Sequence, residues 1–315
     1  MTHAAERLAP KGADHVAVPD IDPMVPRPFR IERVRREVAG VFSWDLRALD
    51  GEPFKFLPGQ FNMLYAPGLG EVAISVSGDC RDGTTLVHTI RAVGTVTKAM
   101  ASLRAGAMIG VRGPFGSAWP VEAAYGKDIV FITGTVGLAP LRPLIYEVLH
   151  RREKFGKVII NYGSRGIDDI LYERDLHVWR GRFDLEVHVT VHTAPSGYRG
   201  RVGSVAAAVK ISRFEGGSAM AFVCRSEALT HSAVQALADR GVTTDRIYVT
   251  LLAHDAQTFL EGGTMSEVPL SMANVYESQR SEQKIQLTGE SAEELGSAET
   301  DFAVTGFQVL TLRVK

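Results

Sequence analysis

Two glycine turns are the parts of this chain with the clearest chemistry. Gly94 ends an apolar segment that begins at Leu86, Gly134 ends another that begins at Val130, and each turn leads into a helical pattern. Glycine lets main-chain N–H groups approach a phosphate closely, and the following helix adds partial positive charge at its first turn. Forty positions separate the two glycines. The pattern predicts two nucleotide-like ligands side by side, such as a flavin and a nicotinamide.

Short strand patterns recur between Phe29 and Trp119, separated by Gly, Pro and Asp turns. This rhythm is typical of an antiparallel barrel or sandwich. One helical pattern, residues 96–103, interrupts it directly after Gly94. The expected strands are residues 29–34, 41–49, 60–67, 71–77, 86–93 and 108–113.

From Lys127 onward, strand and helix patterns alternate. Such alternation indicates a parallel, doubly wound sheet that binds ligands at the carboxyl ends of its strands. The expected strands are residues 128–133, 157–163, 185–192, 219–224 and 246–252, and the expected helices are residues 138–152, 168–179 and 227–239. Beyond them, residues 284–289 and 302–315 are also strand-like.

Six motifs between Pro26 and Leu252 resemble, in their order, the ferredoxin–NADP reductase superfamily. They are PGQFNMLY (58–65), EVAISVSG (71–78), HTIRAVGTVT (88–97), VRGPFG (111–116), GLAPLRP (137–143) and NYGSR (161–165). More narrowly, the chain is similar to gamma subunits of cytoplasmic nickel–iron hydrogenases and sulfhydrogenases. The resemblance implies a β plus α/β architecture: an antiparallel FAD-binding β-barrel over residues 26–122, then a doubly wound parallel α/β NAD(P)-binding domain over residues 127–252. Residues 1–25 are expected to be a flexible leader, and residues 253–315 a divergent acidic tail.

The resemblance assigns the flavin site to the first domain. The family often carries Arg-x-Tyr-Ser on the strand after PGQF, whereas this chain has Val-Ala-Ile-Ser and keeps only Ser75. Phosphate binding is therefore expected from Arg91 and the Gly94 turn. His88 is also open to a packing role on its strand. The predicted FAD-binding residues are Ser75, His88, Ile90, Arg91, Gly94, Thr95, Val96 and Thr97.

The nicotinamide site is expected in the second domain. Thr135 stands where the family has a glycine, which narrows the turn and adds a hydroxyl donor. Arg165 could pair with a 2′-phosphate, since a guanidinium suits phosphate, or could be an exposed loop arginine. The cofactor is therefore NADP or NAD. The predicted residues are Gly134, Thr135, Gly137, Ala139, Pro140, Ser164, Arg165, Cys224 and Arg225.

Cys224-Arg225 departs from the Cys-Gly-Pro of the family. The family glycine leaves room for the nicotinamide ring, and Arg225 puts a charged side chain at that point. This side chain either turns to solvent or fills the pocket.

Composition limits the remaining possibilities. The two cysteines are too few for a conventional iron–sulfur cluster, which takes four thiolates, so no cluster is expected in this chain. The resembled subunits carry a cysteine-rich cluster loop in the tail, where this chain has none. The net charge of −1 gives no case for nucleic acid, no segment is apolar enough to span a bilayer, and a reduced cytoplasmic protein is expected. No metal and no acid–base catalytic side chain are expected.

The resemblance implies an FAD-dependent electron-transfer subunit. It would exchange hydride with NAD(P)H and pass single electrons to a partner redox subunit, iron–sulfur or hydrogenase-type. A dihydroorotate dehydrogenase electron-transfer subunit or a stand-alone flavin reductase is an alternative within the superfamily. A degenerate or structural subunit that keeps the fold without nicotinamide chemistry is an alternative from another class.

Overall fold

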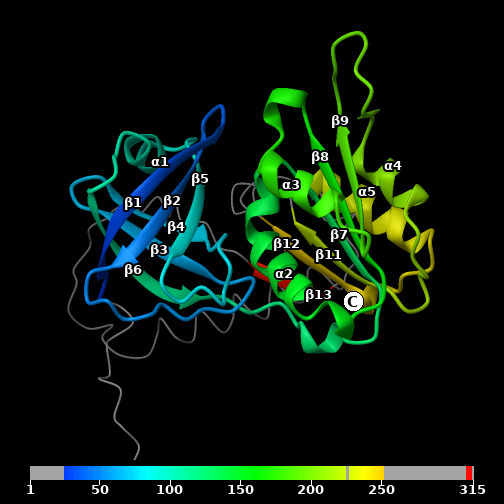
Figure 1. Cartoon of the computed structure of the whole chain (residues 1–315), viewed down its shortest axis with the longest axis horizontal. Helices are drawn as coiled ribbons and strands as arrows, with labels where there is room; N and C mark the ends of the chain where they lie inside the picture. Colours follow the sequence, from blue (N-terminus) through cyan, green and yellow to red (C-terminus); the bar gives the residue numbers. More distant parts are fainter. Residues whose placement is uncertain (1–24, 225–226, 252–309, 314–315) are drawn as a thin grey trace, which may run out of the picture.

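The computed structural model describes residues 25–224, 227–251 and 310–313, which form two lobes lying side by side (Figure 1). The N-terminal lobe is a six-stranded antiparallel sheet with the strand order β4-β3-β6-β1-β2-β5. Its strands are β1 (Arg27–Val38), β2 (Val41–Ala48), β3 (Phe61–Ala66), β4 (Gly70–Ser75), β5 (Leu86–Arg91) and β6 (Met108–Phe115), and helix α1 (Thr95–Met100) follows β5.

The sheet closes into a barrel because its two edge strands meet. Val76, just after β4, forms an antiparallel bridge with His88 on β5. Alternation along β2 shows how the sequence fills the barrel: Trp44 and Leu46 have no exposed surface, while Arg47 is exposed. Every second side chain along the strand therefore points into the barrel core, and the side chains between them point away from it.

The second lobe is a seven-stranded sheet with the order β10-β9-β8-β7-β11-β12-β13. Neighbouring strands run parallel from β10 to β12, and β13 is antiparallel to β12. The strands are β7 (Ile129–Gly134), β8 (Val158–Ser164), β9 (Leu185–Val191), β10 (Arg201–Val202), β11 (Met220–Cys224), β12 (Ile247–Leu251) and β13 (Leu310–Arg313). The helices are α2 (Leu138–His150), α3 (Glu173–Arg180), α4 (Val205–Ile211) and α5 (Glu227–Ala238).

Helices cover both faces of this sheet, as the alternation along β7 shows. Ile129 and Phe131 pack in one buried cluster with residues of α2 and α3. Val130 and Ile132 pack in a separate cluster with residues of α4 and α5. Figure 1 shows α2 and α3 on the side of the sheet nearer the barrel. The lobe is therefore a doubly wound α/β fold, and the predicted combination of an antiparallel barrel and a parallel α/β sheet is confirmed.

The helix predictions need three corrections. The helix after Gly94 is shorter than predicted and ends at Met100. The segment predicted as one helix over residues 168–179 is a 3-10 turn, Ile167–Asp169, followed by α3 from Glu173. Helix α4 was not predicted at all. The C-terminal strand pattern contains β13, whereas residues 284–289 lie outside the described residues.

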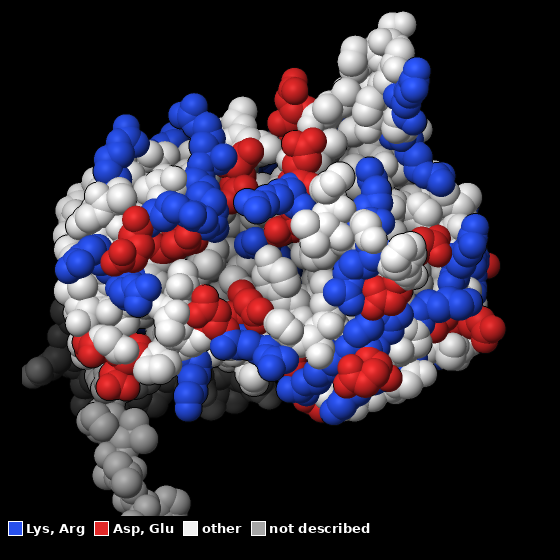
Figure 2. Space-filling model, in the orientation of Figure 1, with Lys and Arg blue, Asp and Glu red and all other residues white. Residues whose placement is uncertain are grey.

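Charged side chains of both signs are interspersed over the face seen in Figure 2. A field of one sign, which binding to a polyanion needs, is not present on this face. In the described parts of the chain, no helix has the length and apolar character needed to cross a membrane.

Candidate functional site

A buried polar cluster lies next to the family's serine position in the barrel. His88 and Asn62 have no exposed surface, and Ser75 is 9% exposed. His88 Nδ1 is 2.9 Å from the Ser75 carbonyl oxygen, which can only accept, so Nδ1 carries the proton. Asn62 Nδ2 then donates to His88 Nε2 at 3.1 Å. The main chain of Ser75 is thus held from inside the barrel.

Burial lowers the pKa of His88 to about 4, although hydrogen bonds to the main chain of Ser75 and Ile74 oppose this shift. The imidazole is therefore neutral at neutral pH. Ile90, two residues further along β5, is also fully buried. Neither side chain presents any surface to a ligand, so the structure gives both residues a packing role.

The Gly94 turn contains open main chain and one side chain that is already engaged. Gly94 and Thr95 are exposed, and α1 begins without a side-chain cap. Thr97 is buried, and its Oγ1 accepts hydrogen bonds from the N–H groups of Val93 and Gly94. Thr97 therefore shapes the turn instead of facing outward. Val96 is half-buried against the barrel core, beside Gly70.

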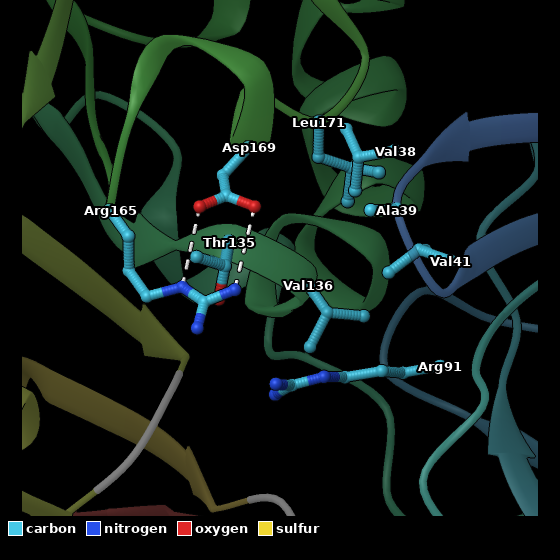
Figure 3. A pocket seen from close by; sticks show the side chains of 9 residues that line it. All are labelled: Val38, Ala39, Val41, Arg91, Thr135, Val136, Arg165, Asp169 and Leu171. Carbon is cyan, nitrogen blue, oxygen red and sulfur yellow. Dashed lines mark hydrogen bonds and ion pairs between the residues drawn. The ribbon is translucent and has the colours of Figure 1, made fainter.

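Arg91 extends from the end of β5 into a pocket between the two lobes (Figure 3). Facing it from the α/β lobe are Thr135 and Val136, with Arg165 beyond them. Among the described residues, Arg91 makes no side-chain hydrogen bond or ion pair. The pocket thus collects three predicted site residues from both lobes, but none from Gly94–Thr97. Its lining is Val38, Ala39, Val41, Arg91, Thr135, Val136, Arg165, Asp169 and Leu171.

The turn between β7 and α2 has a strained residue and a tightly enclosed one. Thr135 has φ 44°, in the left-handed region that favours glycine. Its backbone therefore keeps a conformation suited to the glycine that it replaces. Gly137 is enclosed, because an added Cβ would lie 2.5 Å from the Cys224 carbonyl oxygen and 2.7 Å from Thr133 Oγ1.

The remaining residues of this turn are interior. Gly134, at the end of β7, is buried, and Ala139 and Pro140 are buried in the first turn of α2. They support the start of the helix. The turn itself meets the pocket through Thr135 and Val136.

Ser164 and Arg165 are adjacent in sequence but differ in role. Ser164 is fully buried, and its hydroxyl donates to the Gly166 carbonyl oxygen at 2.8 Å. Arg165 has 67% of its side chain exposed and forms an ion pair with Asp169 at 3.4 Å. Of the two, only Arg165 offers a free surface to a ligand, and Asp169 neutralises part of its charge.

The two cysteines lie in unrelated environments. Cys224, at the end of β11, is fully buried, and its carbonyl oxygen accepts from Thr133 Oγ1 at 2.8 Å. Cys80 is half-buried beside Glu147, and burial together with that carboxylate raises the pKa of its thiol to about 12. Arg225 lies outside the described residues. Within those residues, no group of three or more His, Cys, Asp or Glu side chains could hold a metal.

Two groups of pocket residues were not predicted from the sequence. One is the β1–β2 hairpin of the barrel, and the other is the loop before α3. Nothing in the sequence marks Val38, Ala39 and Val41 as site residues, since they join two ordinary strands. Asp169 carried a usable signal, because it stands four residues after Arg165, a spacing that suits an ion pair.

An antiparallel barrel followed by a doubly wound sheet, with a pocket between them that both lobes line, defines the ferredoxin reductase-like class of oxidoreductases. Residues 131–235 match the family model of the oxidoreductase NAD-binding domain.

Relatives of this class cover most of the chain. Sulfhydrogenase 2 subunit gamma of Pyrococcus furiosus is 30% identical over 239 residues, which are 70% of this chain and 82% of the relative. The probable dihydroorotate dehydrogenase B (NAD(+)), electron transfer subunit, of Archaeoglobus fulgidus is 32% identical over 212 residues, 67% of this chain and 77% of the relative. The chain therefore belongs to the ferredoxin reductase-like family of electron-transfer oxidoreductase subunits that includes these relatives.

Solved structures agree on the fold. The FAD/NAD-binding domain of nitric oxide dioxygenase from Vibrio cholerae superposes with a TM-score of 0.64 at 16% identity, covering 72% of this chain and 98% of that domain.

Proposed function

We propose that this chain is an FAD-dependent electron-transfer subunit that takes hydride from NAD(P)H and passes single electrons to a partner redox protein. The pocket between the lobes is the observation that carries the proposal. Arg91 from the barrel and Arg165 from the α/β lobe flank Thr135 and Val136. These two residues lie in the 3-10 turn (Thr135–Gly137) that leads into α2, so its helix dipole adds partial positive charge to that of the two guanidinium groups. Such a pocket suits the phosphates of a dinucleotide.

The Gly94 turn fits a flavin phosphate. A Cβ added at Gly94 would meet only Thr97 Oγ1, at 3.9 Å, so the space in front of the main chain is open. The first N–H groups of a helix have no partner within the helix, which makes them available to an anion. We assign FAD to this turn, with Thr95 as a further hydroxyl donor and Ser75 near the ring.

The β7–α2 turn fits the nicotinamide dinucleotide. Thr135 keeps the left-handed backbone of a glycine and adds a hydroxyl, and the residue is half-buried. Arg165 would meet a 2′-phosphate, and Asp169 beside it would suit the hydroxyls of an unphosphorylated ribose. The pair accounts for either NADP or NAD. The ratio of the KM values for NADPH and NADH, before and after Arg165→Ala, decides between them.

The chemistry belongs to the flavin, which when bound converts the two-electron hydride into single-electron steps. The side chains bind and orient. Arg91 and Arg165 neutralise phosphate charge, and His88 holds the Ser75 main chain. No side chain needs to give or take a proton.

Electrons have to pass to another polypeptide in this proposal. Cys80 and Cys224 are the only thiols of the chain, fewer than a conventional cluster uses. We therefore propose a partner that carries its own iron–sulfur or hydrogenase-type centre. We also propose a cytoplasmic location, since two cysteines in a chain of this length are too few for the disulfide framework of a secreted protein.

Anaerobic titration of the purified chain tests the proposal. We expect a yellow protein whose flavin absorbance NADPH or NADH bleaches, and no stoichiometric iron or labile sulfide in the lone chain. A yellow protein that neither nucleotide bleaches would favour the structural-subunit alternative. A colourless protein that does not take up added FAD would reject the electron-transfer function and leave only a flavin-free structural subunit.

A further inference from the structure

Tyr172 crosses from the α/β lobe to the barrel. It lies between the Ile167–Asp169 turn and α3, is 6% exposed, and has φ 54° and ψ 45°. Thr135 and Tyr172 are the two non-glycine residues with positive φ in the ranges that the structure describes. A positive φ is unfavourable for a residue with a bulky side chain. Such a residue keeps this backbone conformation only where the surrounding structure holds it in place. Contacts across the lobe boundary supply that constraint.

The Tyr172 hydroxyl enters a buried network of barrel hydroxyls. Its Oη lies 2.5 Å from Thr89 Oγ1. Thr89 Oγ1 is also 2.7 Å from Ser43 Oγ and 2.9 Å from Ser77 Oγ. Ser43 and Thr89 are paired in register on neighbouring strands β2 and β5. Since hydrogen bonds in such a chain polarise one another, the position of one hydroxyl depends on the others.

Arg142 of α2 holds the other side of the same ring. Its guanidinium carbon is 4.2 Å from the centroid of Tyr172, and its Nη1 donates to the Ser77 carbonyl oxygen at 3.1 Å. Nε of Arg142 pairs with Asp175 of α3 at 2.8 Å. Two side chains of the α/β lobe thus grip the barrel at Ser77 and Thr89.

This contact is linked to the pocket by the loop that carries it. Leu171, directly before Tyr172, lines the pocket, as do Arg165 and Asp169 (Figure 3). The Leu171 N–H donates to Tyr162 Oη at 2.9 Å, which anchors the loop to β8. A shift of Tyr172 therefore moves the pocket wall relative to Arg91.

We propose that Tyr172 is a positioning residue that latches the α/β lobe onto Thr89 of the barrel and so sets the spacing between the two cofactors. The predicted effect of Tyr172 on hydride transfer rests on the proposed function. Its predicted effect on the coupling between the two lobes does not. Burial raises the pKa of Tyr172, so the phenol stays protonated and can donate to Thr89. The His150–Asp79 pair also joins the two lobes, but its side chains are 42% and 29% exposed, and exposed pairs stabilise little.

Tyr172→Phe tests the latch, because it keeps the ring over Arg142 and removes only the hydroxyl. We expect full FAD occupancy, weaker long-wavelength charge-transfer absorbance with NAD(P)H, and flavin reduction about fivefold slower in anaerobic stopped-flow mixing, the scale of one buried hydrogen bond. Thr89→Val should act alike, and the double variant should be no slower than either single one. Tyr125→Phe is the matched control, since its hydroxyl bonds Arg151 at 2.7 Å within the α/β lobe.

Scanning calorimetry of the same variants without added cofactor separates the latch from the proposed function. The native chain and Tyr125→Phe should unfold in one coupled transition, and Tyr172→Phe should unfold in two less coupled ones. If the native chain showed no flavin reduction by NAD(P)H, but Tyr172→Phe still unfolded in two transitions and the native chain in one, the proposed function would be rejected and the latch would stand. Native-like reduction and a single native-like transition in Tyr172→Phe would overturn the latch, as would loss of FAD from that variant.

Discussion

Gly94 and Gly137 each stand just before a helix that follows a buried strand, yet their surroundings are opposite. Gly94 is exposed, and an added methyl group would meet almost nothing. Gly137 is buried, and the same methyl group would collide with the end of β11. One glycine leaves room for a ligand, and the other leaves room for the protein itself. A glycine in a strand-to-helix turn therefore does not by itself mark a ligand site.

Gly137→Ala should show the largest effect in this comparison. The new Cβ would push on the Cys224 carbonyl oxygen at 2.5 Å and weaken its hydrogen bond with Thr133. We expect the free energy of unfolding to fall by about 3 kcal/mol, as for overpacking of a rigid core. Urea unfolding followed by circular dichroism measures it. Gly217→Ala is the control, since no atom lies within 4 Å of its Cβ position and its φ is not in the left-handed region. Equal stability of the two variants would contradict the assignment.

Gly94→Val should have the converse result. The φ of −95° suits any residue, and the space around the new side chain is open, so we expect native stability. The branched side chain would occupy the place assigned to the flavin phosphate, and FAD should bind up to about a hundredfold more weakly. Flavin fluorescence titration measures the affinity, with Gly217→Val as the matched control. Full flavin occupancy in Gly94→Val would remove FAD from this turn.

The same two turns show what the sequence could predict. Strand alternation and glycine turns follow from local chemistry, so both sheets and the starts of α1 and α2 were predictable. Side-chain roles were not, because they depend on distant neighbours. Thr97 is a candidate ligand donor in sequence, but its hydroxyl closes its own turn. Ser164 similarly bonds its own loop.

Contacts between the lobes were the least predictable part. Tyr172 falls inside what sequence reasoning takes for an ordinary helix, and its partner Thr89 is 83 residues away. Helix α4 was missed for a local reason: the segment is short and follows a loop that gives no periodic pattern. Long-range pairing leaves no spacing signal in a single sequence.

Acid should destabilise the native protein through His88 in the barrel. His88 lies on the strand that leads to Gly94, and its pKa falls from 6.5 to about 4 on folding. Below pH 6.5 the unfolded chain takes up a proton that the native state refuses, so the contribution of His88 to stability is complete above pH 6.5 and is lost toward pH 4. The expected loss between pH 7 and pH 5 is about 2 kcal/mol.

Urea unfolding at both pH values measures this loss. His88→Gln should have a shallower pH dependence than the native chain, whereas His192→Gln, at an exposed position, should not. An unchanged pH dependence in His88→Gln would show that the histidine is already solvated in the native barrel.

Thr135→Gly should have the smallest effect and the opposite sign. Removing the side chain releases left-handed strain of roughly 1–2 kcal/mol, and the extra freedom of glycine in the unfolded chain returns roughly 0.5–1 kcal/mol. The variant should therefore be more stable by about 1 kcal/mol or less in urea unfolding. If the Thr135 hydroxyl binds the dinucleotide, the same variant should have a higher KM for NAD(P)H. A more stable variant with an unchanged KM would show that the threonine is merely tolerated, while a less stable one would mean that contacts of its side chain outweigh the strain. The Gly94 turn has no such strain to release, because the φ of Gly94 is negative. The two turns therefore differ in strain as well as in the space around their glycines.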